Sequence, residues 1–275
     1  MDKSSTWAAC VVSYNDQASL NNLLESLNNQ TLLPETVYIS DNNSDNEIVI
    51  NNNLSFKINL INNDKNNGFA SAANIALKKA INDGYEKFIL FSQDVIIEKN
   101  GCEKLISGLL NEDAICFPKM LDRNKNVVFS LGGYVKKYTG NIYLEKKKIK
   151  NNFDWADGSC LAFTKKIFES INGFSEDYFM YFEDVDFCFK AKKMGFSLKF
   201  CSVVASQNPN GPSPYLRSRN SLIFAKSTKE STLITVLILR NIIGALKSLI
   251  KLKFSDANQR IIGIFEGLRF NKNEK

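Results

Sequence analysis

The feature that most constrains the fold is an alternation of short apolar runs with helical patterns over the first 94 residues. The runs "WAACVVSY", "TVYIS", "KINLIN" and "KFILFSQD" have the length and composition of buried strands. Leu20, Leu23, Leu24 and Leu27 follow the spacing of one helical face, and "FASAANIALKKAINDG" indicates a second helix. A β-α-β-β-α-β order predicts an α/β fold, a Rossmann-like and mostly parallel sheet with helices on both faces.

The alternation is less regular after residue 110. "AICFP", "VVFSLGG", "DGSCLAF" and "FSLKFCSVV" predict strands, "TKKIFESI" and "EDVDFCFKAKKMG" predict helices, and "KKYTGNIYLEKKKIK" predicts an exposed loop or hairpin. We expect one large domain over residues 1–225, with a nucleotide-binding half (about 1–118) and an acceptor half (about 119–225). Residues 226–275, which include "STLITVLILRNIIGALKSLIKL", are expected to form a basic amphipathic helical tail.

The net charge of +6 is concentrated in that tail. Residues 226–275 contain 10 Lys and Arg against 4 Asp and Glu, whereas residues 1–225 contain 25 of each. This asymmetry predicts an anionic partner, and because the tail lacks interleaved aromatic residues we expect a membrane surface and no nucleic acid. An ordinary packed helix is the alternative.

Two absences concern the location of the protein. The start "MDKSSTWAACVVSY" has no basic segment leading into an apolar one, so we expect no secretory signal. No uninterrupted apolar run reaches about 18 residues, so we expect no membrane-spanning helix. These patterns predict a cytoplasmic protein, bound peripherally to the inner face of the cell membrane.

The composition also limits the chemistry. The chain has no histidine, and its six cysteines form no C-x-x-C pair, which argues against zinc. A general base must therefore be a carboxylate, or a perturbed lysine, cysteine or tyrosine. No G-x-G-x-x-G, Walker or G-x-S-x-G motif is present. Acids and amides in "SYND", "SDNNSD", "NNDKNNG" and "SQDV" instead follow strands, where α/β sheets bind ligands.

An ordered set of motifs carries a resemblance to a known family. "VVSYND", "ISDNNSD", "NNGFASAAN", "FSQDV", "DGSCLAF", "GFSEDYFMYFEDVDFCFKAKKMGF" and "PYLRSRN" occur in sequence over roughly residues 9–225. In this order the chain resembles a family 2 glycosyltransferase of the GT-A fold, in its bacterial rhamnosyltransferase-like branch. Each motif alone is weak, whereas seven in the right order are specific.

The resemblance implies roles for individual residues. Asp41 would accept a hydrogen bond from a pyrimidine base, and Arg219, followed by Asn220, would lie near the donor diphosphate. The full nucleotide-binding set that the resemblance implies is Val12, Ser13, Tyr14, Asn15, Asp41, Asn66, Gly68, Asn74 and Arg219. Asp41 alone is equally compatible with a turn, because Asp side chains bond to the local backbone.

The resemblance also implies a divalent metal and a carboxylate base. Asp94 matches the last acid of a D-x-D-type motif whose first position is Ser92 here, and Gln207 lies where the family often has a histidine ligand. Mn²⁺ or Mg²⁺ suits such oxygen ligands. Glu183 and Asp184 match the catalytic E-D pair, with Asp184 as base. All these acids could instead be turn or first-turn acids, a reading that fits Asp186 best.

The resulting interpretation is an inverting glycosyltransferase. It would move a sugar from dTDP-rhamnose, or from a UDP-sugar as the second choice of donor, to a hydroxyl group. The hydroxyl would belong to a lipid-linked or oligosaccharide precursor of a bacterial surface glycan. The alternative is a catalytically inactive, nucleotide-binding scaffold of a glycan-assembly complex. The missing histidine favours that alternative, and the retained Asp94, Glu183 and Asp184 disfavour it.

Overall fold

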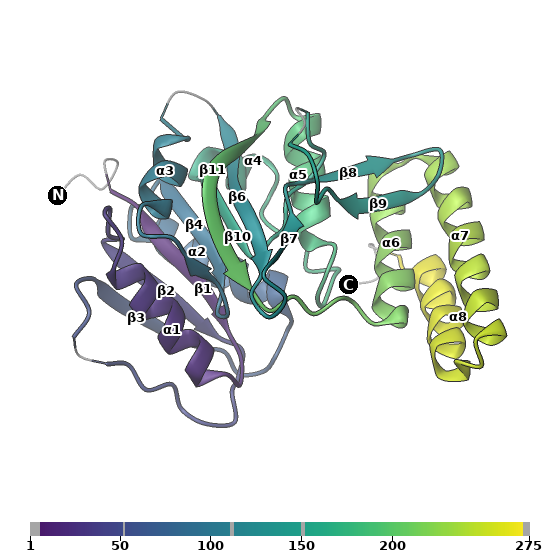
Figure 1. Cartoon of the computed structure of the whole chain (residues 1–275), viewed down its shortest axis with the longest axis horizontal. Coiled ribbons are helices and arrows are strands. Elements are labelled where there is room, and N and C mark those ends of the chain that lie inside the picture. The colour runs from purple at the N-terminus through teal and green to yellow at the C-terminus, as the bar shows by residue number, and fades with distance from the viewer. Residues whose placement is uncertain (1–5, 52, 111–112, 150–151, 272–275) are drawn as a thin grey trace.

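A nine-stranded mixed sheet forms the centre of the protein. The computed structural model describes residues 6–51, 53–110, 113–149 and 152–271. The strand order is β3-β2-β1-β4-β10-β6-β11-β5, with β7 paired to β6 (Figure 1). The strands are β1 (Ala8–Ser13), β2 (Thr36–Asp41), β3 (Lys57–Asn62), β4 (Lys87–Ser92), β5 (Ile96–Ile97), β6 (Ala114–Asp122), β7 (Val127–Ser130), β10 (Cys160–Thr164) and β11 (Ser197–Gln207).

Strand direction decides which loops meet. The strands β3, β2, β1 and β4 are mutually parallel, so their carboxyl ends lie at one edge of the sheet. The strand β10 runs antiparallel to β4, which brings the beginning of β10 to that same edge. The parallel pair β6 and β11 also ends there. The loops that carry the candidate acids therefore converge.

Helices cover both faces of this sheet, as predicted. They are α1 (Gln17–Asn28), α2 (Phe69–Asn82), α3 (Gly101–Ser107), α4 (Lys165–Ser170) and α5 (Glu183–Lys193). The helices α1 and α3 pack into one apolar core and α2, α4 and α5 into another. The four leucines predicted to share a face of α1 are all buried, and Asp16 caps that helix by accepting from the Ser19 amide. The short helix α3 was not predicted.

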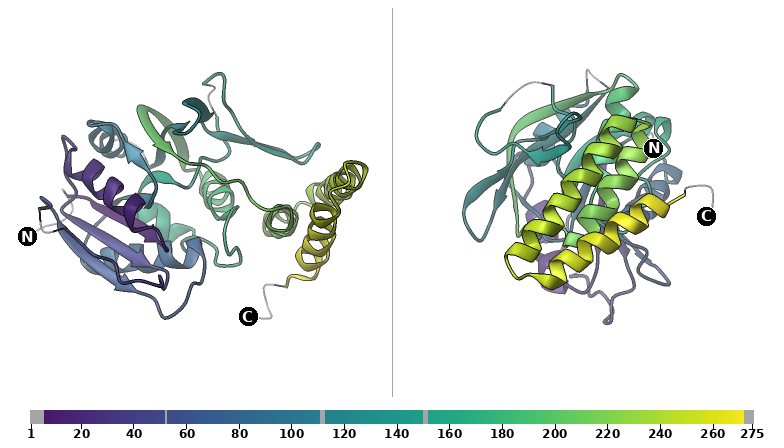
Figure 2. Two further views of the ribbon diagram at one scale, coloured as in Figure 1. Left: turned by 60° about the horizontal axis from the view of Figure 1, so that its bottom comes forward. Right: turned by 90° about the vertical axis from the view of Figure 1, so that its right-hand side faces the viewer.

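Three further helices and a hairpin lie beyond the sheet. The hairpin strands β8 (Gly133–Lys136) and β9 (Asn141–Leu144) extend towards α6 (Pro214–Thr228) and α7 (Ser231–Ile250), and α8 (Phe254–Arg269) packs on both helices (Figures 1 and 2). The boundary expected after residue 225 falls inside α6. The helical layer thus begins at Pro214.

Close packing holds this layer together. The buried amide of Asn241 on α7 joins the hydroxyls of Ser218 and Ser221 on α6, at 3.2 Å each. Gly263 and Gly267 on α8 face α6, where an added Cβ would come within 2.5 and 2.8 Å of backbone oxygens. Small residues at this spacing let two helix backbones approach closely.

The surface of the helical layer is unusually apolar. Leu239, Ile243, Leu246 and Ile250 on α7 are exposed, and similar side chains are exposed on α8. By length and composition α7 could cross a membrane, and 28% of that stretch is buried within the protein. Exposed apolar patches of this kind mark interaction surfaces.

Candidate active site

Four carboxylates from three separate segments line one pocket of about 250 Å³, which we call the carboxylate pocket. Asp94 follows β4, Asp157 precedes β10, and Glu183 and Asp184 begin α5. The Ser92 amide donates to the Ser159 carbonyl at 2.9 Å, which fixes the end of β4 beside the start of β10. The antiparallel insertion of β10 thus places Asp157 opposite Asp94.

Asp184 is held by two backbone amides. The Gly158 N–H donates to Oδ2 at 3.0 Å and the Val185 N–H donates to Oδ1 at 2.8 Å. A Cβ on Gly158 would lie 2.8 Å from the Asp184 Cβ, so only glycine permits this approach. Burial, with the nearby Asp157 charge, raises the pKa of Asp184 from 3.8 to about 7. A carboxylate with this pKa suits general base catalysis near neutral pH.

Glu183 lies deeper than its neighbour. It is buried, and within the described part of the chain its Oε2 atom has no hydrogen-bond partner. Burial and the Asp184 charge raise its pKa well above the ordinary value. Because adjacent helical residues diverge by about 100°, Glu183 and Asp184 cannot both point at one substrate atom. Asp186 instead forms an ion pair with Lys190 and accepts from the Ser227 hydroxyl, which is a structural arrangement.

A strained turn aims the two acids into the pocket. Tyr181 and Phe182 have φ angles of 69° and 77°, a conformation that costs non-glycine residues about 1–3 kcal/mol each. The Asn220 amide on α6 holds this turn by donating to the carbonyls of Met180 and Tyr181, at 2.9 Å each. Asn220 therefore supports the loop, a role that its pairing with Arg219 in the sequence did not reveal.

Asp94 and Gln207, the two metal candidates, line this same pocket. Arg123 ties their segments together by donating from Nη2 to the carbonyls of Asp94 (2.6 Å) and Ser206 (3.0 Å). Burial raises the pKa of Asp94. No cluster of three His, Cys, Asp or Glu that could hold a metal occurs among the described residues. One carboxylate and one amide nevertheless fit a Mg²⁺ or Mn²⁺ ion whose other ligands are water and donor phosphates.

The end of β1 is fastened to the turn that carries Asp94. The Gln93 side chain accepts from the Ser13 hydroxyl (2.8 Å) and the Tyr14 amide (2.9 Å), and it donates to the Tyr14 carbonyl (2.9 Å). Sequence reasoning missed both Gln93 and Asp157. The signal for each was a polar residue at a strand end, in "SQDV" and "DGSCLAF".

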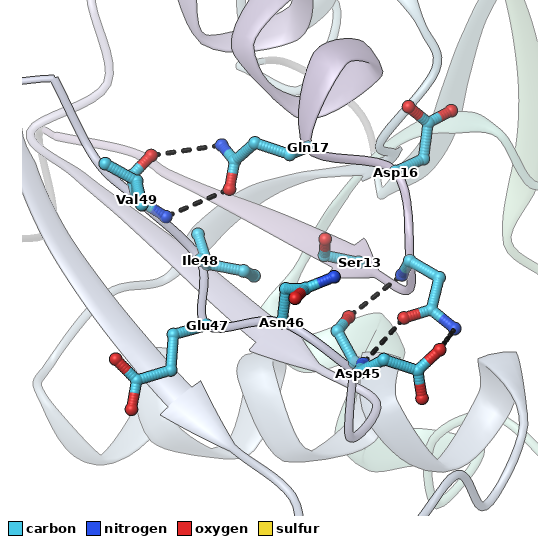
Figure 3. Close-up of a pocket in the computed structure, with 10 residues that line it drawn as sticks. Ser13, Asp16, Gln17, Asp45, Asn46, Glu47, Ile48 and Val49 are labelled. Atoms are coloured by element: carbon cyan, nitrogen blue, oxygen red, sulfur yellow. Dashed lines mark hydrogen bonds between the residues drawn. The ribbon is translucent and has the colours of Figure 1, made fainter.

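A second pocket of about 350 Å³ lies between the start of α1 and the loop after β2 (Figure 3). Of the nucleotide candidates, Ser13 and Asn15 line it. Asn15 exchanges two hydrogen bonds with Asp45, and the Gln17 amide pairs with the Val49 backbone, so both walls are linked (Figure 3).

The other nucleotide candidates do not line either pocket. Asp41 accepts from the amide and hydroxyl of Ser44, which closes a turn. Val12 is buried within β1, and Asn66 accepts from the amide of Gly68, whose carbonyl in turn accepts from Asn42. Gly68, with φ 87°, lies against the Phe179 carbonyl.

Asn74 and Arg219 are occupied elsewhere. Asn74 bonds to the backbone of Phe174 through both ends of its amide. The Arg219 guanidinium donates to the Asp177 carbonyl at 3.3 Å and lies 3.9 Å from Glu266 on α8. In the described structure these two side chains hold loops together. The nucleotide-binding roles of the whole set stay predictions.

Comparison with known proteins decides the family. The model of glycosyl transferase family 2 matches residues 8–171, more than half of the chain. The chain belongs to glycosyl transferase family 2. The family match covers β1 to α4 and includes Asp94 and Asp157, but it ends before Glu183 and Asp184.

Two curated relatives place this family 2 chain among sugar transferases. It is 27% identical over 194 residues to "dTDP-rhamnosyl transferase RfbF" of Shigella flexneri, which covers 68% of this chain and 63% of the relative. It is 23% identical over 151 residues to "Low-salt glycan biosynthesis hexosyltransferase Agl10" of Haloferax volcanii, covering 50% and 48%. The chain thus matches less than two thirds of the length of either relative.

Solved structures share the fold over nearly the whole family 2 chain. GalNAc-T7 with UDP, GalNAc and Mn²⁺ aligns with a TM-score of 0.66 at 14% identity, covering 92% of this chain and 54% of that one. Staphylococcus aureus TarS 1–349 with UDP-GlcNAc aligns at 0.62 and 17%, covering 96% and 81%. The mannosyltransferase PcManGT of Pyrobaculum calidifontis, with GDP-Man and Mn²⁺, aligns at 0.58 and 13%, covering 98% and 88%. The predicted GT-A fold is confirmed.

Proposed function

We propose that this protein is an inverting glycosyltransferase that uses a nucleotide sugar and has Asp184 as its general base. The observation that carries the proposal is the position of Asp184, whose pKa of about 7 lets it exchange a proton near neutrality, beside Asp94 and Glu183 in one pocket. Membership of family 2 supports this chemistry.

The reaction is an in-line displacement. As the acceptor oxygen forms a bond to the anomeric carbon, Asp184 takes the hydroxyl proton. The bond between that carbon and the diphosphate oxygen breaks on the opposite face and its electron pair leaves with the nucleoside diphosphate, so the anomeric configuration inverts. Glu183 is buried and its pKa is raised. When Glu183 is protonated, it places no second negative charge beside Asp184.

Asp94 and Gln207 would hold the divalent cation. When bound, Mn²⁺ or Mg²⁺ supplies Lewis-acid stabilisation of the diphosphate charge. Asp41, Asn66, Gly68 and the end of β1 would bind the base and ribose, as the family resemblance implies. Gln93 bonds to Ser13 and Arg123 bonds to the Asp94 carbonyl, and these contacts keep the segments in place.

The donor we propose is dTDP-rhamnose, with a UDP-sugar second, and the acceptor is a hydroxyl of a bacterial surface glycan precursor. The match to the rhamnosyl transferase RfbF supports the choice of sugar. Calorimetry with dTDP-rhamnose, UDP-glucose, UDP-GlcNAc and GDP-mannose, with and without Mn²⁺, tests it. We expect tightest binding of dTDP-rhamnose with Mn²⁺. Preference for a GDP-sugar would overturn the donor assignment.

The exposed apolar face of α7 and α8 supports a peripheral location on an anionic membrane. Lys251 and Lys253 flank the exposed Leu252 at the turn between the helices. Each lysine near such a surface contributes about 1 kcal/mol. We expect flotation with phosphatidylglycerol vesicles, weaker flotation after Lys251→Gln/Lys253→Gln, and none with phosphatidylcholine alone. Equal flotation with both lipids would contradict the electrostatic part.

A catalytically inactive, nucleotide-binding scaffold is the second candidate. It is favoured by Gln207, an amide where the resemblance implies histidine, and by the lack of a three-ligand metal cluster in the described segments. Such a scaffold would bind a nucleotide sugar without releasing nucleoside diphosphate. Release of the diphosphate from any bound donor would exclude it.

A further inference from the structure

A third pocket, of about 880 Å³, lies between the β8–β9 hairpin and the three C-terminal helices. Four cations line it, namely Arg217, Arg240, Lys247 and Arg260, and no carboxylate does so among its described lining residues. We call it the cationic pocket. A cluster of like charges without a counter-ion is costly to assemble, so an anionic ligand is the natural partner.

Among the described residues, no ion pair involves any of the four cations of this pocket. Within the described segments, Arg260 Nε is buried without a hydrogen-bond partner. Partial burial, together with the charges of Arg260 and Arg240, lowers the pKa of Arg217. Of the described acids in the helical layer, Glu230 pairs with Lys137 and Glu266 bonds to Tyr215 and Arg219. Asp256 lies in the first turn of α8, and no ion pair between it and the pocket cations occurs among the described residues. Arg240 donates to the Thr139 carbonyl at 3.3 Å and to the Asn141 side chain at 3.0 Å, but both acceptors are neutral. The positive charge of the pocket therefore favours an added anion.

Apolar side chains form much of the remaining lining, beside the polar Thr139, Ser221 and Asn241. Ile142 of the hairpin, Phe182, and Val236, Leu237, Leu239 and Ile243 of α7 line the pocket. Leu239 and Ile243 are 56% and 51% exposed, so the apolar lining continues onto the outer face of α7. A ligand that matches both features carries an anionic group on a long apolar chain.

The cationic pocket and the carboxylate pocket share a wall. Tyr181 lines the carboxylate pocket and Phe182, the next residue, lines the cationic pocket. The segment 207–210 likewise lines the first and Pro212, Pro214 and Arg217 line the second. The strained turn and this segment thus lie between a ligand anchored at the arginines and Asp184.

We propose that the cationic pocket binds the phosphate or diphosphate of an acceptor carried on an aliphatic chain, with the chain along α7 and the acceptor glycan directed past Phe182 to Asp184. The part that concerns the acceptor rests on the proposed glycosyltransferase function. Guanidinium groups bind phosphate oxygens through paired, charge-assisted hydrogen bonds, which explains why three of the four cations are arginines.

Direct binding tests the pocket without requiring turnover. Calorimetry in EDTA would use farnesyl diphosphate, inorganic pyrophosphate and farnesol as probes below their aggregation limits. We expect farnesyl diphosphate to bind more tightly than pyrophosphate, and farnesol to bind weakly. Arg217→Gln/Arg260→Gln should raise the farnesyl diphosphate Kd at least about tenfold, because the variant loses charge-assisted hydrogen bonds to the diphosphate oxygens.

Lys251→Gln/Lys253→Gln is the matched control, since it removes two positive charges from the same layer outside the pocket. Its Kd should stay within about twofold of wild type. The proposal would be overturned if both double variants lost affinity for farnesyl diphosphate equally, or if the Kd of the arginine variant were unchanged. It would also be overturned if farnesol bound as tightly as farnesyl diphosphate. Arg217→Gln alone, at an exposed side chain, provides the same comparison if the double variant does not fold.

The source of the anion and the proposed function are tested separately. Phosphatidylglycerol vesicles serve as the membrane arm: if their binding requires Arg217 and Arg260 while soluble farnesyl diphosphate does not bind, the pocket holds a lipid headgroup and the acceptor assignment is wrong. Asp94→Asn should leave the farnesyl diphosphate Kd unchanged, and a changed Kd in this variant would show that the probe occupies the donor site. If the protein binds farnesyl diphosphate but uses no nucleotide sugar, the anion-binding role of the cationic pocket stands and only the proposed function is wrong.

Discussion

Replacing Asp184 by Asn should change the free energy of unfolding in a pH-dependent way. In the folded protein the Asp184 pKa is raised from 3.8 to about 7 by burial and the Asp157 charge. Below pH 3.8 the carboxyl is protonated in both the folded and the unfolded state, so its burial as a charge does not lower the free energy of unfolding. As pH rises towards 7 only the unfolded chain loses the proton, so wild-type stability falls. A shift of about three pKa units corresponds to about 4 kcal/mol once pH exceeds 7.

The side-chain amide of the Asp184→Asn variant carries no charge, but it has one hydrogen-bond acceptor oxygen fewer than the carboxylate. Two backbone N–H groups, of Gly158 and Val185, now donate to the carboxylate, and Asn offers one oxygen to both. The unsatisfied donor costs about 1–3 kcal/mol. At pH 8 we expect Asp184→Asn to be more stable than wild type by about 1–3 kcal/mol, and at pH 4 less stable by a similar amount.

Urea denaturation of both proteins at half-unit steps from pH 4 to 8 measures this difference. The stability of the variant relative to wild type should change by about 4 kcal/mol across the range. Subtracting the two curves cancels every group that titrates equally in both. A constant difference between pH 4 and 8 would refute the raised pKa, and with it the physical basis for assigning Asp184 as base.

Three further substitutions test residues in the carboxylate pocket and on the helix that begins there. Asp94→Asn should abolish the Mn²⁺-dependent part of nucleoside diphosphate binding in calorimetry while leaving nucleoside binding intact; unchanged metal dependence would show that Asp94 is not a ligand. Asp186→Asn should lower the unfolding free energy by about 1–3 kcal/mol, because it weakens the interactions of the buried carboxylate with Lys190 and Ser227, and should leave the donor Kd unchanged. Gly158→Ala should reduce kcat at least about tenfold with little effect on donor KM, because its Cβ would displace the Asp184 side chain; a wild-type kcat would show that this contact is soft.

The sequence predicted the parts of the fold that depend on local pattern. The strands β1 to β4 and the helices between them occur where the apolar runs and the leucine spacing placed them, because each of these elements buries a face that is visible in the sequence. Helix α3 was not predicted, because its sequence "GCEKLIS" is short and has no distinctive capping residue.

The site was harder to predict because it depends on pairings between distant segments. Asp157 was hidden in a strand-start motif, and only the antiparallel insertion of β10 between β4 and β6 brings it to Asp94. Asp41 fits the turn interpretation equally well, since its carboxylate bonds to Ser44. The excess charge of the tail was visible in the sequence, but its convergence into a pocket beside Phe182 required the packing of three helices.

The most direct test of the central claim is the release of nucleoside diphosphate by wild type and by Asp184→Asn. Both proteins would be incubated with dTDP-rhamnose, and then with the other donors, in Mn²⁺ at pH 8, with a lipid-linked acceptor mixture. We predict release by wild type with at least one donor and a rate about 10²–10⁴ times lower in the variant, with donor binding retained. Equal rates in the two proteins would contradict the role of Asp184. If Glu183→Gln alone were inactive, the base would be Glu183.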